Sequence, residues 1–192
     1  MSFTLSAGEA LAVTGRNGAG KSSLLAILAG RLAPEAGAVR AGGLGERSLP
    51  ESLHLIGHRD GLKNSLGAAE NLAFARDLLG EPALSPEQAL GAVGLAHAAE
   101  FPVGYLSAGQ RRRVALARLL VAKRPLWLLD EPFTALDAGA QGMLLVLMQA
   151  HLAEGGLVIA ATHQPLGIPA AQELRLGPAA RSPGEALAVA AP

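Results

Sequence analysis

Residues 15 to 22 read Gly15-Arg16-Asn17-Gly18-Ala19-Gly20-Lys21-Ser22, and this stretch decides the fold. It matches the pattern G-x-x-x-x-G-K-[ST], with one further glycine inside. An apolar run at residues 10–14 predicts a strand before it, and helical spacing at residues 22–32 predicts a helix after it. Glycines let the backbone wrap around phosphate oxygens, and the unpaired N–H groups at a helix start favour anions. We therefore expect a phosphate-binding loop, with Ser23 in the same nucleotide-binding set.

Two carboxylates follow an apolar stretch that predicts a buried strand, Leu126-Trp127-Leu128-Leu129-Asp130-Glu131. The carboxyl end of such a strand lies in the crevice where α/β folds bind ligands. We expect Asp130 to hold Mg²⁺ together with the Ser22 hydroxyl, while Lys21 reaches the outer phosphates. Glu131 is then placed to polarise an attacking water. Alone, such a pair is often a solvated strand end, but the glycine loop favours a nucleotide hydrolase.

A third motif lies between the other two and narrows the class. Leu106-Ser107-Ala108-Gly109-Gln110 ends 20 residues before Asp130 and opens a helix predicted at residues 108–122. Ser107 and the backbone around Gly109 offer hydrogen-bond donors at a helix N-terminus, which suits a phosphate. Such pentapeptides are common, so the signal comes from the motif's place between the glycine loop and the carboxylates.

Composition excludes several other classes. The chain has 192 residues, 16 basic and 16 acidic side chains and no cysteine. Zero net charge argues against a protein that binds nucleic acid through bulk positive charge. The absence of cysteine excludes disulfides, thiolate metal sites and cysteine nucleophiles. Half of the residues are hydrophobic, yet the longest apolar runs are shorter than the roughly 18 residues that a spanning helix needs. We expect the excess apolar surface in a core or a protein interface.

Apolar strands alternate with helices along the chain, which predicts an α/β fold with a mainly parallel sheet. Phe3 and Leu5 predict one more strand, joined to residues 10–14 by a turn at residues 7–9. Ser85 and Pro86 predict a helix start. We find no linker, so residues 1–192 are expected to form one domain. The remaining expected elements are strands at residues 53–57 and 157–161, helical segments between 66 and about 100, a helix at 137–154, and a short strand with loops in 38–50.

The three motifs, in their order along the chain, resemble those of the ATP-binding-cassette (ABC) ATPases. Thr134-Ala135-Leu136-Asp137 is similar to their D-loop, and His163 after Thr162 is similar to their switch histidine. The resemblance implies a P-loop core with a small N-terminal antiparallel β part and a helical subdomain at about residues 60–107. It also implies a head-to-tail dimer, most simply a homodimer, in which each ATP lies between the glycine loop of one chain and residues 106–110 of the other. Glu131 would be the general base, His163 would contact the γ-phosphate, and Asp137 would couple the sites.

Within that family, the chain resembles the haem-exporter ATPases of cytochrome c biogenesis. Gly57-His58, residues 130–137 and Thr162-His163-Gln164-Pro165-Leu166 carry this resemblance. It implies integral membrane subunits as partners and a peripheral place on the cytoplasmic face of the bacterial inner membrane. ATP would energise haem export or the release of a haem–chaperone complex. The chain itself contains no haem-ligand motif.

The sequence departs from the family pattern at two places. His58 stands where most cassettes carry the glutamine that senses Mg²⁺ and the membrane subunit. A further strand and an adenine-stacking aromatic residue are expected before residue 1 and are missing from the chain.

Three other functions remain open at this stage. They are an ABC ATPase for another cargo, a soluble cassette acting on nucleic acid, and a non-transport P-loop enzyme such as a small-molecule kinase. The basic run at residues 111–113, with Arg118, is expected to form a solvated helix face with interface contacts rather than a nucleic-acid site.

Overall fold

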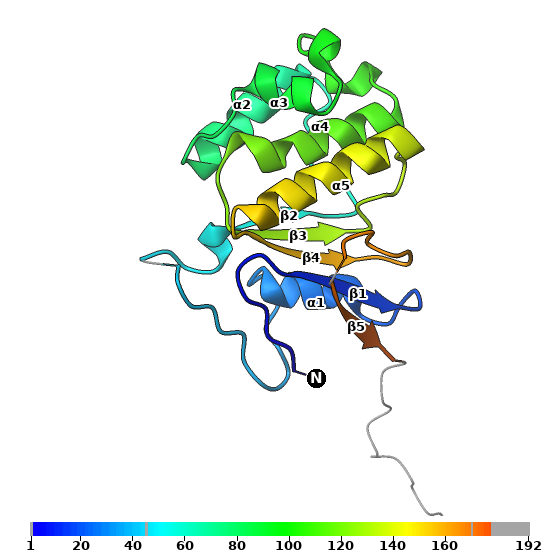
Figure 1. The fold of residues 1–192 in the computed structure, drawn as a ribbon. Helices are drawn as coiled ribbons and strands as arrows, with labels where there is room; N and C mark the ends of the chain where they lie inside the picture. The colour runs from blue at the N-terminus through cyan, green and yellow to red at the C-terminus, as the bar shows by residue number, and fades with distance from the viewer. Residues whose placement is uncertain (1, 45, 170, 178–192) are drawn as a thin grey trace, which may run out of the picture.

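The computed structural model describes residues 2–44, 46–169 and 171–177 and builds them around a five-stranded sheet (Figure 1). Every pair of neighbouring strands is parallel, and their order across the sheet is β2-β3-β4-β1-β5. This confirms the predicted α/β fold with a parallel sheet. The strands are β1 (Ala10–Gly15), β2 (Leu53–Ile56), β3 (Leu126–Asp130), β4 (Leu157–Ala161) and β5 (Gln172–Leu176).

Helices cover both faces of the sheet. Helix α1 (Lys21–Leu28) packs on one face, and α4 (Ala108–Val121) and α5 (Ala138–Ala153) lie on the other. Helices α2 (Ala68–Leu79) and α3 (Pro86–Ala92) pack on α4, on its side away from the sheet (Figure 1). Short 3-10 turns lie at Pro50–Ser52, Ala96–Ala98 and Val103–Tyr105.

The strands form where the sequence offers short apolar runs, because a parallel sheet covered on both faces buries both sides of its strands. Leu128 and Leu129 are neighbours on β3 and are both fully buried. Leu129 joins the cluster that packs under α5, and Leu128 joins the cluster that packs on α1. A third cluster, inside the helical part, holds α2, α3 and α4 together.

Side-chain caps fix where the helices begin. Ser85 accepts a hydrogen bond from the N–H of Gln88 at the start of α3, with Pro86 at its first position, as predicted. Ser107 accepts the N–H of Gln110 at the start of α4, and the Gln110 side chain accepts the N–H of Ser107. This reciprocal capping box satisfies two backbone donors that a helix end leaves unpaired.

The predicted strand at Phe3 and Leu5 is wrong. Both side chains are half-buried against the α1 cluster and alternate with exposed neighbours, but no backbone hydrogen bond joins Phe3 or Leu5 to another described residue, so no ladder forms. The small N-terminal antiparallel part is therefore not formed by the described residues, in which every strand pair is parallel. The short strand expected in residues 38–50 is likewise wrong, because the described part of this Gly-rich segment is largely exposed and unpaired.

The edge strand β5 is an element that the sequence did not indicate. Its residues are mostly polar and exposed, and its hydrogen-bonding partner β1 lies about 160 residues earlier in the chain. Among the described residues, no helix is long and apolar enough to cross a membrane.

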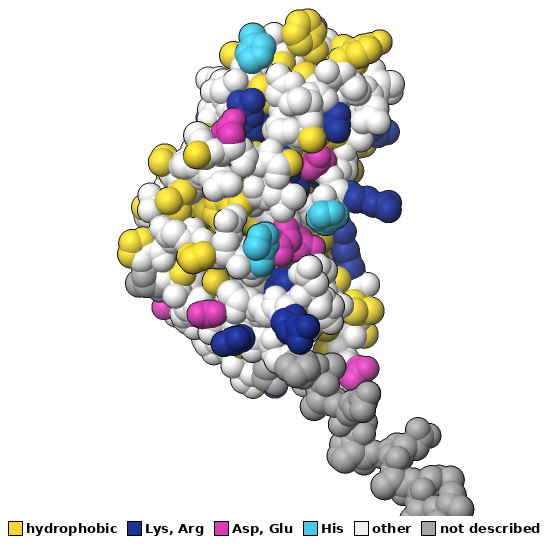
Figure 2. Space-filling view, turned by 90° about the vertical axis from the view of Figure 1, so that its right-hand side faces the viewer, with side chains coloured by type: hydrophobic (Ala, Val, Ile, Leu, Met, Phe, Trp, Pro, Cys, Tyr) yellow, Lys and Arg dark blue, Asp and Glu magenta, His cyan; other side chains and the backbone are white. Residues whose placement is uncertain are grey.

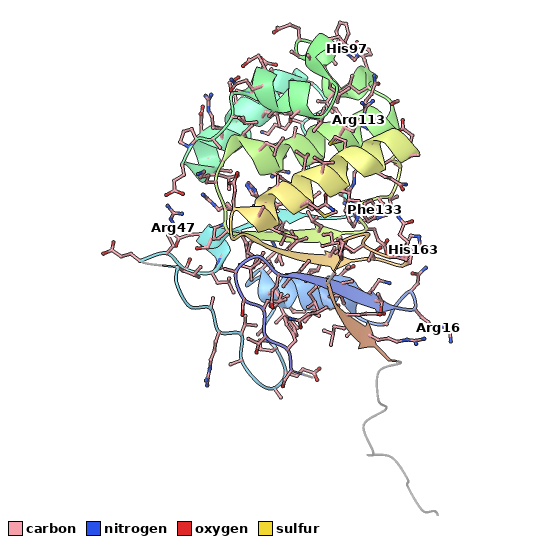
Figure 3. The ribbon with its side chains drawn as sticks, viewed as in Figure 1. Arg16, Arg47, His97, Arg113, Phe133 and His163 are labelled. Atoms are coloured by element: carbon pink, nitrogen blue, oxygen red, sulfur yellow. The ribbon has the colours of Figure 1, made fainter. Side chains whose placement is uncertain are left out.

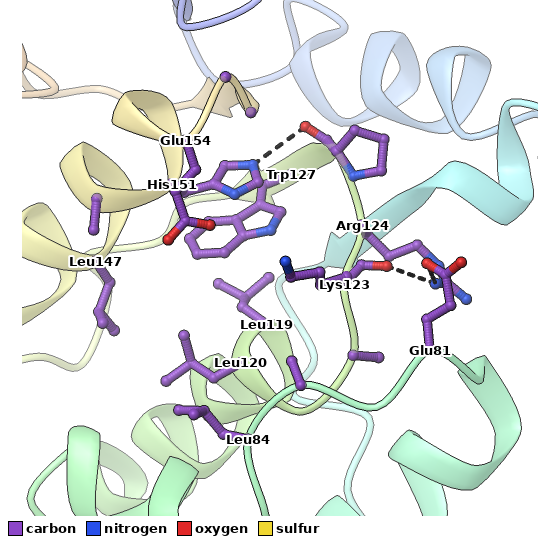
Figure 4. Close-up of a pocket in the computed structure, with 16 residues that line it drawn as sticks. Glu81, Leu84, Leu119, Leu120, Lys123, Arg124, Trp127, Leu147, His151 and Glu154 are labelled. Atoms are coloured by element: carbon purple, nitrogen blue, oxygen red, sulfur yellow. Dashed lines mark hydrogen bonds and ion pairs between the residues drawn. The ribbon is translucent and has the colours of Figure 1, made fainter. Parts of the chain in front are cut away.

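A cavity of about 530 Å³ lies at the amino ends of the strands, away from the glycine loop (Figure 4). Trp127 and His151 form one wall, with ring centroids 4.0 Å apart and planes inclined by 8°. His151 Nε2 also donates a hydrogen bond of 3.2 Å to the carbonyl oxygen of Pro125, so this stack joins α5 to the start of β3.

Candidate nucleotide site

The glycine loop leaves β1, closes a turn in which the Ala19 N–H donates to the Arg16 carbonyl oxygen, and enters α1. Gly18 and Gly20 have φ of 79° and 97°, values that glycine adopts without the steric cost that other residues meet. Gly20 caps α1, and the first helical bond runs from Leu24 N–H to the carbonyl oxygen of Gly20. The N–H groups of residues 20–23 find no acceptor among the described residues. A helix start with free N–H groups attracts an anion, as the sequence predicts for a phosphate.

Lys21 is held inside the loop rather than extended into solvent. It is 7% exposed, and its Nζ donates a hydrogen bond of 2.9 Å to the carbonyl oxygen of Gly15. The same Nζ lies 3.9 Å from Oε1 of Glu131. The fold therefore brings together two residues that are 110 positions apart in sequence. The ammonium group is placed at the centre of the loop, where phosphate oxygens would meet it.

Glu131 and His163 form the second contact of the site. His163 Nδ1 donates a hydrogen bond of 2.7 Å to Oε2 of Glu131. Thr162 is buried, and its hydroxyl donates a hydrogen bond of 3.0 Å to the carbonyl oxygen of Gln164. This bond closes the turn that contains His163. The Nδ1 contact with the carboxylate leaves the Nε2 of His163 to face other groups. The His163 side chain is 65% exposed, so it is open to a ligand.

These contacts gather because the carboxyl ends of parallel strands share one edge of the sheet. The glycine loop follows β1, Glu131 follows β3, His163 follows β4, and His58 follows β2. Figure 2 looks onto this edge and shows acidic and histidine side chains at its centre with lysine and arginine side chains around them. Figure 3 shows Arg16 and His163 projecting on this same side of the sheet.

Ser22 and Asp130 fit a magnesium ion that also binds a nucleotide. Asp130 ends β3, is 8% exposed, and its carboxylate makes no recorded hydrogen bond or ion pair to a described residue. Ser22 is exposed in the first turn of α1. Among the described residues, no cluster of three His, Cys, Asp or Glu side chains is placed to hold a metal alone. Magnesium commonly takes one or two protein oxygens and completes its shell with waters and phosphates, so a hydroxyl and a carboxylate suffice.

The third motif lies apart from the glycine loop. Ser107 and Ala108 are exposed at the start of α4, and the described residues show no hydrogen bond between residues 106–110 and the loop. Gly109 packs instead near Ala135, where an added Cβ would lie 2.9 Å from the Ala135 carbonyl oxygen. Leu106 is buried and anchors the segment.

Two further predicted residues lie outside the contacts between Lys21, Glu131 and His163. Asp137 is exposed and caps α5, accepting the N–H of Ala140 at 2.8 Å. His58 is exposed in the bend after β2.

The expectation that the basic run forms a solvated helix face is wrong for Arg112. This side chain is 4% exposed, and it donates hydrogen bonds to the backbone carbonyls of Asp130 and Glu131. The helical periodicity of α4 turns Arg112 towards the backbone of Asp130 and Glu131. Three consecutive arginines do not reveal that one of them binds Asp130, which lies 18 residues away in sequence. Arg113 is different, since its contact is the carbonyl oxygen of Val93 in the helical part.

Comparison with known proteins shows the family of this chain. Residues 1–134 match the family model described as ABC transporter. The chain belongs to the ABC transporter family. Its fold agrees with two solved structures. One is a Pyrococcus furiosus protein described as an ABC transporter ATP-binding protein, with a TM-score of 0.80 and 24% identity over 92% of this chain and 88% of the other. The second is an ATP-binding subunit of an ABC transporter, with a TM-score of 0.73 and 26% identity over 83% and 70%.

Close relatives of this ABC ATPase share a single description. A protein from Rhodopseudomonas palustris (strain BisB5) is 58% identical over 94% of this chain and 90% of its own length. One from Bradyrhizobium diazoefficiens is 54% identical over 92% and 88%. Both are named cytochrome c biogenesis ATP-binding export protein CcmA.

Family membership excludes one of the functions that the sequence left open. An ABC ATPase binds ATP and, as a class, works as a dimer with membrane partners. The small-molecule kinase alternative is therefore excluded.

Proposed function

We propose that this chain is the ATP-binding and ATP-hydrolysing subunit of an ABC exporter in c-type cytochrome biogenesis. The observation that carries the proposal is 58% identity, over 94% of the chain, to a relative named as an export protein of that process. Haem, or a haem–chaperone complex to be released, is the proposed cargo. The sequence resemblance supports this choice, and the chain's own residues contribute only the ATP chemistry.

Glu131 is proposed as the general base. Its carboxylate lies 2.7 Å from His163 Nδ1 and 3.9 Å from Lys21 Nζ, so it stands between a group aimed at phosphate and a group open to solvent. A carboxylate there can accept the proton of an attacking water, and Lys21 can stabilise the charge on the outer phosphates. His163 is proposed to contact the γ-phosphate. When bound through Ser22 and Asp130, Mg²⁺ would neutralise phosphate charge.

Residues 106–110 are proposed to complete the ATP site of a second chain. Ser107 is exposed and sits at the positive end of α4, so it can meet a phosphate presented by a partner copy. We propose a head-to-tail homodimer in which the exposed Asp137 lies at the interface and couples the two sites. His58 is proposed to stand at the position where most cassettes carry the glutamine that senses Mg²⁺ and the membrane subunit, next to Gly57, whose carbonyl oxygen Arg112 binds.

The helical segment at about residues 60–107 is proposed as a subdomain of the single ABC domain, because α2 and α3 share a hydrophobic core with α4 and not with the sheet. Docking to integral membrane subunits would place the chain at the cytoplasmic face of the bacterial inner membrane. Exposed Phe74 and Leu78 on α2 support a protein interface in this part, since large exposed apolar side chains that gather on one element mark contact sites.

Gene deletion followed by a haem stain of c-type cytochromes tests the proposed process. The deleted strain is complemented with the wild-type gene, with Glu131→Gln, or with Glu154→Gln, which changes an exposed acid away from the site. We expect the wild type and Glu154→Gln to restore stained cytochromes and Glu131→Gln not to. Normal cytochromes in the deleted strain would refute the assignment to c-type cytochrome biogenesis and leave the ATPase class untouched.

A further inference from the structure

Arg112 is the buried centre of a hydrogen-bond network at the edge of the ATP site. Its Nη1 donates a hydrogen bond of 2.8 Å to the carbonyl oxygen of Gly57 and one of 3.2 Å to the carboxylate of Asp60. Its Nη2 donates hydrogen bonds of 3.0 Å to the carbonyl oxygens of both Asp130 and Glu131. The two terminal nitrogens carry four N–H groups, and the network offers four acceptors. One side chain of α4 thus joins the loop after β2 to the loop after β3.

The backbone of Glu131 needs such a support. Its φ is 47°, in the left-handed region that costs a non-glycine residue free energy and persists only where neighbours enforce it. From β4, the carbonyl oxygen of Ala161 accepts the Glu131 N–H at 2.8 Å. From α4, Arg112 binds the Glu131 carbonyl oxygen, which also accepts the Thr134 N–H at 3.2 Å. The peptide groups on both sides of the Glu131 Cα are therefore held, which sets the direction of the Cα–Cβ bond from which the carboxylate reaches His163 and Lys21.

We infer that Arg112 is a positioning residue that sets the carboxylate of Glu131 for attack of water on ATP. The inference rests on the general-base role proposed for Glu131. Arg112 itself reaches backbone oxygens and Asp60, so it acts through Glu131. A misplacement of about 1 Å in a catalytic group can cost on the order of a hundredfold in rate.

The geometry requires an arginine. A guanidinium presents its N–H groups in a flat, rigid fork, whereas an ammonium is a point with three donors on a flexible stem. Lysine at position 112 would keep the charge and most of the buried volume, but its three donors could not replace all four of the arginine's hydrogen bonds. Arg113 provides the matched control, because it is the next residue of the same helix and its recorded partner is the Val93 carbonyl oxygen, away from the site.

The test compares full-length wild type, Arg112→Lys, Arg113→Lys, Glu131→Gln and the double variant Arg112→Lys/Glu131→Gln. ATP Kd is measured by equilibrium binding, the rate of the chemical step by single-turnover hydrolysis, and folding by thermal unfolding. We expect Arg112→Lys to lose at least about tenfold in rate with ATP Kd changed less than about twofold. Arg113→Lys should match the wild type.

The double variant separates positioning from a general loss of structure. If Arg112 acts through the Glu131 carboxylate, Arg112→Lys should cause no further loss of rate when Glu131 is already glutamine. An unchanged rate in Arg112→Lys, or equal losses in both backgrounds, would overturn the inference. Wild-type turnover in Glu131→Gln alone would instead overturn the proposed role of Glu131.

If Arg112→Lys does not fold, Asp60→Ala provides a second test of the role inferred for Arg112. This change removes one of the four acceptors and leaves the arginine in place. We expect about a threefold loss of single-turnover rate with unchanged ATP Kd. A wild-type rate in a folded Asp60→Ala protein would overturn the inference.

Discussion

Acid should destabilise this protein through His54, a buried residue on β2. The side chain is 4% exposed, and its Nε2 donates a hydrogen bond of 2.8 Å to the carbonyl oxygen of Ala122. Burial disfavours the charged imidazolium and lowers the pKa of His54 from 6.5 to about 4, with the nearby Arg124 acting in the same direction. Between these values the unfolded chain binds a proton that the folded chain excludes. The free energy of unfolding therefore falls as the pH falls from 6.5 towards 4.

The size of the effect follows from the two pKa values. The full difference corresponds to about 3 kcal/mol, and about 2 kcal/mol of it is lost between pH 7.5 and pH 5. His54→Gln keeps a donor for the Ala122 carbonyl and removes the titration. Urea unfolding of both proteins at pH 7.5 and pH 5 should show a smaller loss in the variant, by about 2 kcal/mol.

His97 provides the control, because it is a histidine exposed in the helical part. His97→Gln should keep the pH dependence of the wild type. Equal losses of unfolding free energy in the wild type and His54→Gln would show that the buried imidazole does not carry the effect.

Three further changes test other parts of the molecule. Gly156→Ala places a Cβ 2.2 Å from the His151 ring and should lower the free energy of unfolding by about 1 kcal/mol through loss of the stack; in a His151→Ala background the cost should nearly vanish, and an equal cost would exclude the clash. Asp137→Ala removes the cap of α5 and should cost about 1 kcal/mol in urea unfolding, while Asp137→Asn should cost much less. Lys21→Ala should raise the ATP Kd at least about tenfold in equilibrium binding, since a buried ammonium at the loop centre is lost, and unchanged affinity would refute its phosphate role.

The sequence predicts those parts of the fold whose signals are local. The apolar runs locate β2, β3 and β4 within one residue, and the Ser85-Pro86 cap places the start of α3. Long-range pairing decides the rest. Phe3 and Leu5 have a strand-like alternation but no backbone hydrogen bond to another described residue, so they form no strand. Strand β5 lacks a strong local signal, and it forms because β1 has a free edge that pairs with it.

The site follows the same division. The glycine loop and the carboxylates after β3 each follow an apolar strand, and the rule that parallel strands share a carboxyl edge is enough to expect them together. The rule does not state which strand lies between them. Strand β4 lies between β3 and β1. Its Ala161 carbonyl oxygen accepts the Glu131 N–H, and His163 follows two residues after Ala161. The contact between His163 and Glu131 is a consequence of strand order.

Strand order also explains why Arg112 escapes sequence analysis. The loops after β2 and β3 lie side by side because these strands are neighbours, so a single side chain from α4 can reach both. In the sequence, Gly57 and Asp130 lie 55 and 18 residues from Arg112. No local feature of the sequence distinguishes Arg112 from Arg111 and Arg113. Burial of an arginine is costly unless its donors are paired, and the four acceptors at this edge pair the terminal Nη1 and Nη2 groups, while Nε has no partner among the described residues. The strand order that assembles the ATP site therefore also creates the place where Arg112 is buried. Any change that separated β2 from β3 should disturb Glu131 as well.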